Sequence, residues 1–176
     1  MENSNQSTPP KGPGAVFFEA SARADKIDQA LDCFRQSFNC SQAVVSVYGP
    51  WFGLDREYAL KTSAAFGGGI ARLGETCGAV TGALMVIGLA FGRTKAEDKN
   101  TVELTNRVTD QFIERFKKRN FTLRCSELLG CEVGTPEGMK FLKEHNLRER
   151  LCSHFVKDAA EILEELLFSG VLTDQR

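Results

Sequence analysis

The sequence is short of histidine, net charge and closely spaced cysteines, and each shortage excludes a class of function. Its 22 Lys and Arg residues nearly balance its 23 Asp and Glu residues, which leaves a formal charge of −1. No overall field would therefore attract nucleic acid or an anionic membrane. The two histidines, His145 and His154, form no Ser–His–Asp set, and no phosphate loop or pair of catalytic carboxylates stands out.

The N-terminus lacks the basic and apolar segments of a signal peptide. Residues 1–16 are rich in Ser, Asn, Pro and Gly, and this composition predicts a disordered tail. We therefore expect a cytoplasmic protein whose thiols are kept reduced. The uncharged run from Thr76 to Gly92 contains 17 residues and four glycines. This length is at the short edge of what spans a bilayer, so the run predicts a buried central helix and no membrane span.

Helical patterns cover the rest of the chain, and no stretch alternates as a strand does. Asn39, Asp55 and Thr135 are each placed to cap a helix. Leu104 and Phe112 belong to an apolar stripe at successive i+4 steps. We predict an all-α fold, a compact bundle of six to eight helices around a central glycine-rich apolar helix near residues 73–92. Residues 17–176 have the length of one domain.

Six cysteines are present, and their helical neighbours predict which of them face inward. Four lie on apolar or small faces: Cys40, Cys77, Cys125 and Cys152. Cys33 has Gln29 and Gln36 beside it, so we expect it on a solvated side. Cys131 follows a glycine in a loop, and its direction stays open. In a cytosolic domain of this length, such cysteines indicate metal binding or redox chemistry more than disulfide staples.

Two opposing effects act on the inward thiols. Cys40, Cys77 and Cys152 lie near expected helix starts, where the helix dipole favours a thiolate and lowers the thiol pKa. Burial in apolar surroundings raises the pKa instead. The sequence leaves open which effect dominates.

Three glycines, Gly74, Gly78 and Gly82, recur at intervals of four residues around Cys77. On a helix this spacing removes the side chains from one face. Either another backbone or a compact prosthetic group could then approach Cys77 closely, and ordinary tight helix packing is the simpler interpretation.

The cysteine blocks resemble a known family. NCSQAV at 39–44, GETCGAVTGALMVIGLAFG at 74–92, CSELLGC at 125–131 and CSHFVKDAAEILEELL at 152–167 are similar to the redox-active proteins named after the pattern C_GCAxxG_C_C. The resemblance covers the chain from about residue 25 to its end and implies four shared cysteines, Cys40, Cys77, Cys125 and Cys152. A related domain accompanies haem-binding segments in split-Soret cytochromes, but this chain has no Cys-x-x-Cys-His motif for c-type haem.

Three functions follow for the four cysteines. The first is thiol–disulfide or electron-transfer chemistry with an unknown redox partner, which needs two thiols brought together by the fold because the chain has no Cys-x-x-Cys. The second is a four-cysteine metal site for an iron–sulfur cluster or zinc, although the ligand spacings differ from compact metal motifs. The third is a non-catalytic helical adaptor.

Trp51 and Phe52 are large apolar side chains in an expected connector. We expect them either to form a homo-oligomer interface or to fold back on the core.

Overall fold

The computed structural model describes residues 20–168, with the side chains of residues 25–167. The expected N-terminal tail at 1–16 lies outside the described residues. Within them the chain forms eight α-helices and no strand, which confirms the predicted all-α fold. The α-helices are α1 (Ala20–Arg35), α2 (Cys40–Tyr48), α3 (Arg56–Thr62), α4 (Gly78–Phe91), α5 (Lys99–Asn120), α6 (Cys125–Leu129), α7 (Pro136–Glu144) and α8 (Ser153–Phe168). Three shorter turns are η1 (Gly49–Phe52), η2 (Ala64–Phe66) and the π-helical η3 (Arg148–Cys152).

The expected capping residues begin their helices as local chemistry predicts. The Asn39 side chain accepts a hydrogen bond from the Gln42 backbone, and the Asn39 backbone N–H donates to the Gln42 side chain in return. This capping box satisfies two backbone donors. Asp55 caps α3, and Thr135 caps α7 ahead of Pro136. The element starts therefore follow from short-range sequence signals.

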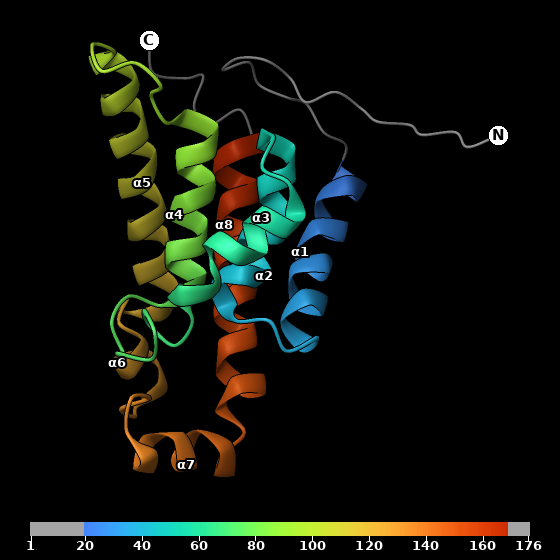
Figure 1. The fold of residues 1–176 in the computed structure, drawn as a ribbon, viewed down its shortest axis with the longest axis vertical. Helices are drawn as coiled ribbons and strands as arrows, with labels where there is room; N and C mark the ends of the chain where they lie inside the picture. The colour runs from blue at the N-terminus through green and yellow to red at the C-terminus, as the bar shows by residue number, and fades with distance from the viewer. Residues whose placement is uncertain (1–19, 169–176) are drawn as a thin grey trace, which may run out of the picture.

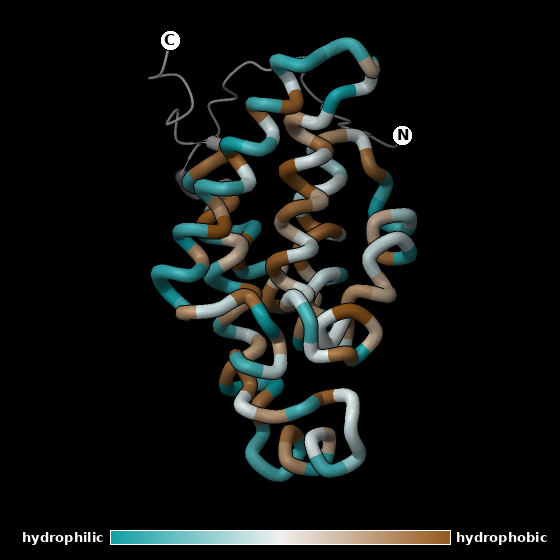
Figure 2. The backbone as a smooth tube through the Cα atoms, turned by 90° about the vertical axis from the view of Figure 1, so that its left-hand side faces the viewer, coloured by the Kyte–Doolittle hydropathy of each residue, from teal (hydrophilic) through white to brown (hydrophobic). Residues whose placement is uncertain are grey.

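The helices pack around α2, α4 and α8. Figure 1 shows α5, α4, α8, α2 and α1 standing roughly upright, with α7 running across one end. Helix α2 packs against α4, while α1 packs on α2 and α8, and α5 packs on α4 and α8. Figure 2 shows hydrophobic residues along the middle of the bundle and hydrophilic residues on its outer turns. This arrangement buries the apolar stripe of α5 at Val108, Phe112 and Phe116.

The central helix is shorter than its uncharged run. It was expected from about residue 73, but α4 begins only at Gly78, with Cys77 as its N-cap residue. Residues ahead of Cys77 form a loop that is hydrogen-bonded to other segments. No described helix has both the length and the apolar character needed to cross a membrane.

Trp51 and Phe52 are half-buried and pack against the hydrophobic core. Of the two expected arrangements, the structure has the one in which they fold back on the core. Tyr48 meets the indole of Trp51 edge to face, with 6.3 Å between the ring centroids. Lys26 Nζ lies 5.1 Å from the indole centroid, in a cation–π contact. A homo-oligomer stays a prediction from the sequence.

Candidate functional site

The four cysteines expected to face inward line one cavity of about 660 Å³ near α6 and α7. Each comes from a different place in the fold: Cys40 begins α2, Cys77 precedes α4, Cys125 begins α6 and Cys152 ends η3. All four side chains are buried and free of disulfides. The fold thus brings together four thiols that lie far apart in the sequence.

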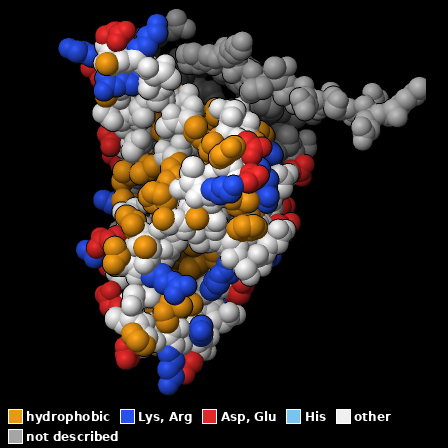
Figure 3. Space-filling view, viewed as in Figure 1, with side chains coloured by type: hydrophobic (Ala, Val, Ile, Leu, Met, Phe, Trp, Pro, Cys, Tyr) orange, Lys and Arg blue, Asp and Glu red, His pale blue; other side chains and the backbone are white. Residues whose placement is uncertain are grey.

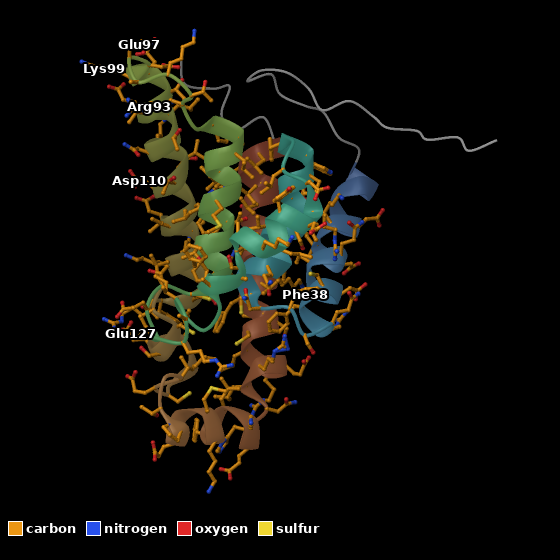
Figure 4. The ribbon with its side chains drawn as sticks, viewed as in Figure 1. Phe38, Arg93, Glu97, Lys99, Asp110 and Glu127 are labelled. Atoms are coloured by element: carbon orange, nitrogen blue, oxygen red, sulfur yellow. The ribbon has the colours of Figure 1, made fainter. Side chains whose placement is uncertain are left out.

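The cavity wall is mainly apolar. Six side chains from α1, α6, the loop after it, α7 and α8 provide much of this surface: Phe34, Leu128, Val133, Met139, Leu142 and Phe155. Figure 3 shows a hollow on this side of the molecule with hydrophobic atoms inside and Lys or Arg atoms beside it. The charged connection between α4 and α5, with Arg93, Glu97 and Lys99, lies at the opposite end of the bundle (Figure 4). The cavity, near α6 and α7, therefore lies away from this charged connection.

Backbone hydrogen bonds hold Cys77 and Cys125 on adjacent segments. Cys77 N donates to Leu123 O at 2.8 Å, and Cys125 N donates to Glu75 O at 2.7 Å. Between these bonds, Thr76 and Arg124 form an isolated antiparallel bridge. This short pairing fixes two of the four thiols relative to each other because it involves the residues next to both.

The loop that leads to this bridge contains a left-handed turn. Five successive residues, from Gly68 to Arg72, have φ between +49° and +69°. L-residues in this region are strained by about 1–2 kcal/mol each, and Ile70 is β-branched as well. At Gly69 an added Cβ would lie 2.7 Å from Cys125 Cβ, so glycine allows this loop to reach the cysteine. The strained turn forms one wall of the cavity through Gly68 and Arg72.

Of the three glycines expected to share one helix face, only two do so in the structure. Gly74 lies outside α4 in a loop with φ of +74°, so the three glycines do not share one helix face. Gly78 and Gly82 do share a face, and it packs on α2. An added Cβ would lie 3.1 Å from Ser41 N at Gly78 and 3.0 Å from Ser41 O at Gly82. The backbone of α2 occupies this face. Tight helix packing, the simpler of the two interpretations, therefore describes these two glycines. Contact of these glycines with a cofactor stays a prediction without geometric support.

Among the cavity thiols, Cys40 and Cys152 are each the largest cause of the other's pKa shift. A side-chain hydrogen bond between them raises the pKa of Cys40 and lowers that of Cys152, because it holds the proton on Cys40 and stabilises a thiolate on Cys152. Burial also raises the pKa of Cys40. At Cys152 burial acts against the shift, whereas the positive charge of Arg148 supports it. A lowered pKa favours the thiolate, so Cys152 is the better candidate for the nucleophile of the pair.

Burial dominates at the other two thiols. It raises the pKa of Cys77 to about 12, although the backbone amides of Ala79 and Val80 act in the opposite direction. Burial also raises the pKa of Cys125, with added repulsion from Cys77 and Cys152. The helix start thus fails to outweigh desolvation at Cys77, which answers the question that the sequence left open.

Arg148 was missed in the sequence analysis, and only long-range contacts identify it. Its Nη2 donates to Phe34 O at 2.8 Å and to Phe38 O at 2.9 Å, and its guanidinium stacks 4.0 Å from the centroid of the Phe34 ring. These contacts hold the side chain at the end of α1, beside Cys152. No local sequence signal predicts them because the partners are more than a hundred residues away.

The expectation for Cys33 was wrong. Its side chain is buried, with 4% exposed, and Cys33 Sγ lies 3.3 Å from Ser46 Oγ. Polar neighbours on α1 suggested solvent, but α2 covers this part of the helix. Cys131 is half-buried in the loop after α6, and burial followed by the charge of Cys152 raises its pKa.

The arrangement of the thiols bears on metal binding. Among the described residues, no group of three or more His, Cys, Asp or Glu side chains is placed to hold a metal ion. The four cysteines share a cavity as they stand, but they do not form a ligand set. An iron–sulfur or zinc site with four cysteine ligands therefore stays a prediction from the sequence.

Comparison with known protein families identifies a match. The family described as "Putative redox-active protein (C_GCAxxG_C_C)" has a model that matches residues 38–166, a range that includes all four cavity cysteines. No curated protein and no solved structure matches the chain.

Proposed function

The chain belongs to the C_GCAxxG_C_C family of redox-active proteins, and we propose that its redox chemistry is thiol–disulfide exchange by Cys40 and Cys152. The observation that carries this proposal is that both thiols are buried, free of disulfides and line one cavity, where each shifts the pKa of the other. A disulfide between them requires their Cα atoms to come within about 4.4–6.8 Å of each other. A cytoplasmic location, where reduced thiols persist, belongs to the same proposal.

The exchange begins at Cys152. Its thiolate attacks one sulfur of an incoming disulfide, the disulfide bond breaks, and a mixed disulfide forms while one thiolate leaves. Cys40 then loses its proton and attacks Cys152 Sγ, which releases the second thiolate. Two electrons pass from the protein thiols to the substrate; one released thiolate takes the proton of Cys40, and the other takes a proton from water, which received the proton of Cys152 when its thiolate formed. The products are a Cys40–Cys152 disulfide and a reduced substrate.

Arg148 and the cavity support the first step. The guanidinium stabilises negative charge on Cys152 because it lies beside the sulfur and is fixed by two backbone carbonyls. Cys77 and Cys125 have raised pKa values, so they stay protonated at neutral pH. We propose that Cys77 and Cys125 react more slowly and become oxidised only after Cys40 and Cys152 have formed a disulfide.

Thiol counting on full-length protein tests the proposal. Purified protein is equilibrated with a buffer that contains a small-molecule disulfide and its thiol. The free thiols of the protein are then counted, and its disulfides are mapped by peptide mass spectrometry. We expect the first oxidation to consume two thiols and to join Cys40 to Cys152. Cys40→Ser should leave Cys152 as a mixed disulfide, whereas Cys152→Ser lacks the attacking thiolate and should form no mixed disulfide at Cys40 on the same time scale. Cys33→Ser is the matched control, a buried thiol outside the cavity, and should behave as wild type.

Other outcomes identify the alternatives. Coloured, iron-containing protein prepared without oxygen, with colour and iron lost in Cys77→Ser, would replace the proposal with an iron–sulfur cluster on the four cysteines. Bound zinc would indicate a structural metal site. Thiols that stay unreactive until the protein unfolds, in metal-free wild type and variants alike, would leave the helical adaptor.

A further inference from the structure

The charge on the cavity wall has one sign. The charged side chains among its described lining residues are Arg72 and Arg148, and no carboxylate lines it. Glu149 lies nearby, with Oε1 4.0 Å from Arg148 Nη1. At Cys152 Sγ, however, the effect of Arg148 exceeds that of Glu149. Of these two charges, the cation therefore has the larger effect on Cys152.

The two arginines differ in how they are held. Arg148 is anchored by Phe34 O and Phe38 O, so its guanidinium is already oriented before a ligand arrives. The Arg72 side chain is exposed and, within residues 25–167, takes part in no hydrogen bond or ion pair. It belongs to the left-handed turn, with φ of +67°. An anchored arginine and an exposed, unengaged one thus line the same cavity.

The size and the apolar wall limit what can enter. A volume of about 660 Å³ lies in the range of small-molecule sites, roughly 300–1,000 Å³. Most of the wall offers apolar contact, from Phe34, Leu128 and Phe155 among others. Guanidinium groups bind carboxylates through paired hydrogen bonds. Together these features favour a small ligand with an apolar body and negative charge.

We infer that the cavity binds a small organic disulfide with a carboxylate on an apolar body, its carboxylate held by Arg72 and Arg148 and its sulfurs turned toward Cys152. This inference rests on the thiol exchange proposed above and names its substrate class. The bonds and electrons are those of that exchange: the ligand disulfide gains two electrons, the two protein thiols lose them, and two ligand thiols leave.

Binding is tested separately from reaction with a thioether that cannot exchange. Calorimetry compares bis(carboxyphenyl) sulfide with its uncharged amide, bis(carbamoylphenyl) sulfide, on reduced full-length protein. We expect the dicarboxylate to bind about tenfold more tightly than the amide, and Arg72→Gln to remove most of that difference. Arg107→Gln, which neutralises an exposed arginine of α5 outside the cavity, should leave it unchanged.

Reaction is tested with dithiobis(nitrobenzoate) and the corresponding diamide. Each rate is divided by the rate for urea-unfolded protein, which removes the intrinsic reactivity of the reagent. We expect a carboxylate preference of about tenfold that falls in Arg72→Gln and at high salt, because screening weakens exposed charge interactions. Circular dichroism and thermal melts show whether each variant is folded.

The two arms separate the two proposals. Exchange at Cys152 without preference for the carboxylate, and equal binding of both thioethers, would overturn the substrate class and keep the thiol chemistry. Equal losses in Arg72→Gln and Arg107→Gln would also overturn it, since overall charge would then explain the preference. Tight, Arg72-dependent binding of the dicarboxylate with thiols that never exchange would overturn the proposed function and leave an anion-binding cavity.

Discussion

The hydrogen bond between Cys40 and Cys152 joins the start of α2 to the turn before α8 and shifts the two thiol pKa values in opposite directions. Two chemically identical side chains thereby acquire different roles. One keeps its proton and the other becomes the better nucleophile, because a shared proton stabilises charge on the acceptor. The asymmetry is a property of the pair and disappears if either partner is removed.

Alkylation should therefore reach Cys152 before the other cavity thiols. Its pKa lies below the ordinary value of 9.0, so its thiolate is populated at lower pH than that of Cys77. Cys40→Ala removes the hydrogen bond and should move the Cys152 pH profile to higher pH. Iodoacetamide labelling at several pH values, with each site read by mass spectrometry, measures both effects. A profile for Cys152 that is the same in wild type and Cys40→Ala would contradict this account.

Alkaline pH should destabilise the fold through Cys77. Its pKa is about 12 in the folded protein and 9.0 ordinarily, so the unfolded chain loses this proton first as pH rises. The contribution of Cys77 to the free energy of unfolding is fully present below pH 9 and is lost between pH 9 and 12. The free energy of unfolding should fall in this window by at most about 1.4 kcal/mol per pH unit because of this group. Urea unfolding measured across this window should show a shallower pH slope for both Cys77→Ser and Cys77→Ala. An unchanged slope in the two variants would show that Cys77 ionises as easily when folded.

Gly78→Ala should destabilise the protein by about 1–3 kcal/mol through overpacking. The new methyl group would lie 2.9 Å from Phe66 O and 3.1 Å from Ser41 N, and backbone atoms cannot move aside cheaply. Gly88→Ala is the matched control on the same helix. Nothing lies within 4 Å of its added Cβ, so it should stabilise by about 0.4–1 kcal/mol. Chemical denaturation of both variants tests the packing, and equal effects would argue against a close approach of α2.

Gly69→Ala tests the left-handed turn against a second matched glycine. Gly69 and Gly130 have similar φ, +69° and +64°, so an alanine at either position suffers similar backbone strain. The Cβ at Gly69 would meet Cys125 Cβ at 2.7 Å, whereas at Gly130 nothing lies within 4 Å. We expect Gly69→Ala to be more destabilising by at least about 1 kcal/mol. Its thiol reactivity should also change, since the loop contacts Cys125. Similar melts for the two variants would place Gly69 away from the cysteine.

Much of the helical framework was predictable because its signals are local. Asn39, Asp55 and Thr135 begin α2, α3 and α7, as their side chains and spacing indicated. The start of α4 was not predictable in this way. The uncharged run continues ahead of Gly78, but Cys77 has a non-helical ψ of 136° and its N–H donates to Leu123 O, so the helix begins only at Gly78.

The sequence by itself determined the helices and the inward direction of Cys40, Cys77, Cys125 and Cys152, because neighbours at i+3 and i+4 share a helix face. It misjudged Cys33 for the same reason: that rule describes one helix, and burial depends on the helix packed against it. Only the tertiary structure decided that Cys40 meets Cys152, that Arg148 stands beside the pair and that Gly78 receives the backbone of α2. These relations arise where distant segments converge, and the chemistry of a thiol depends on what surrounds it in space.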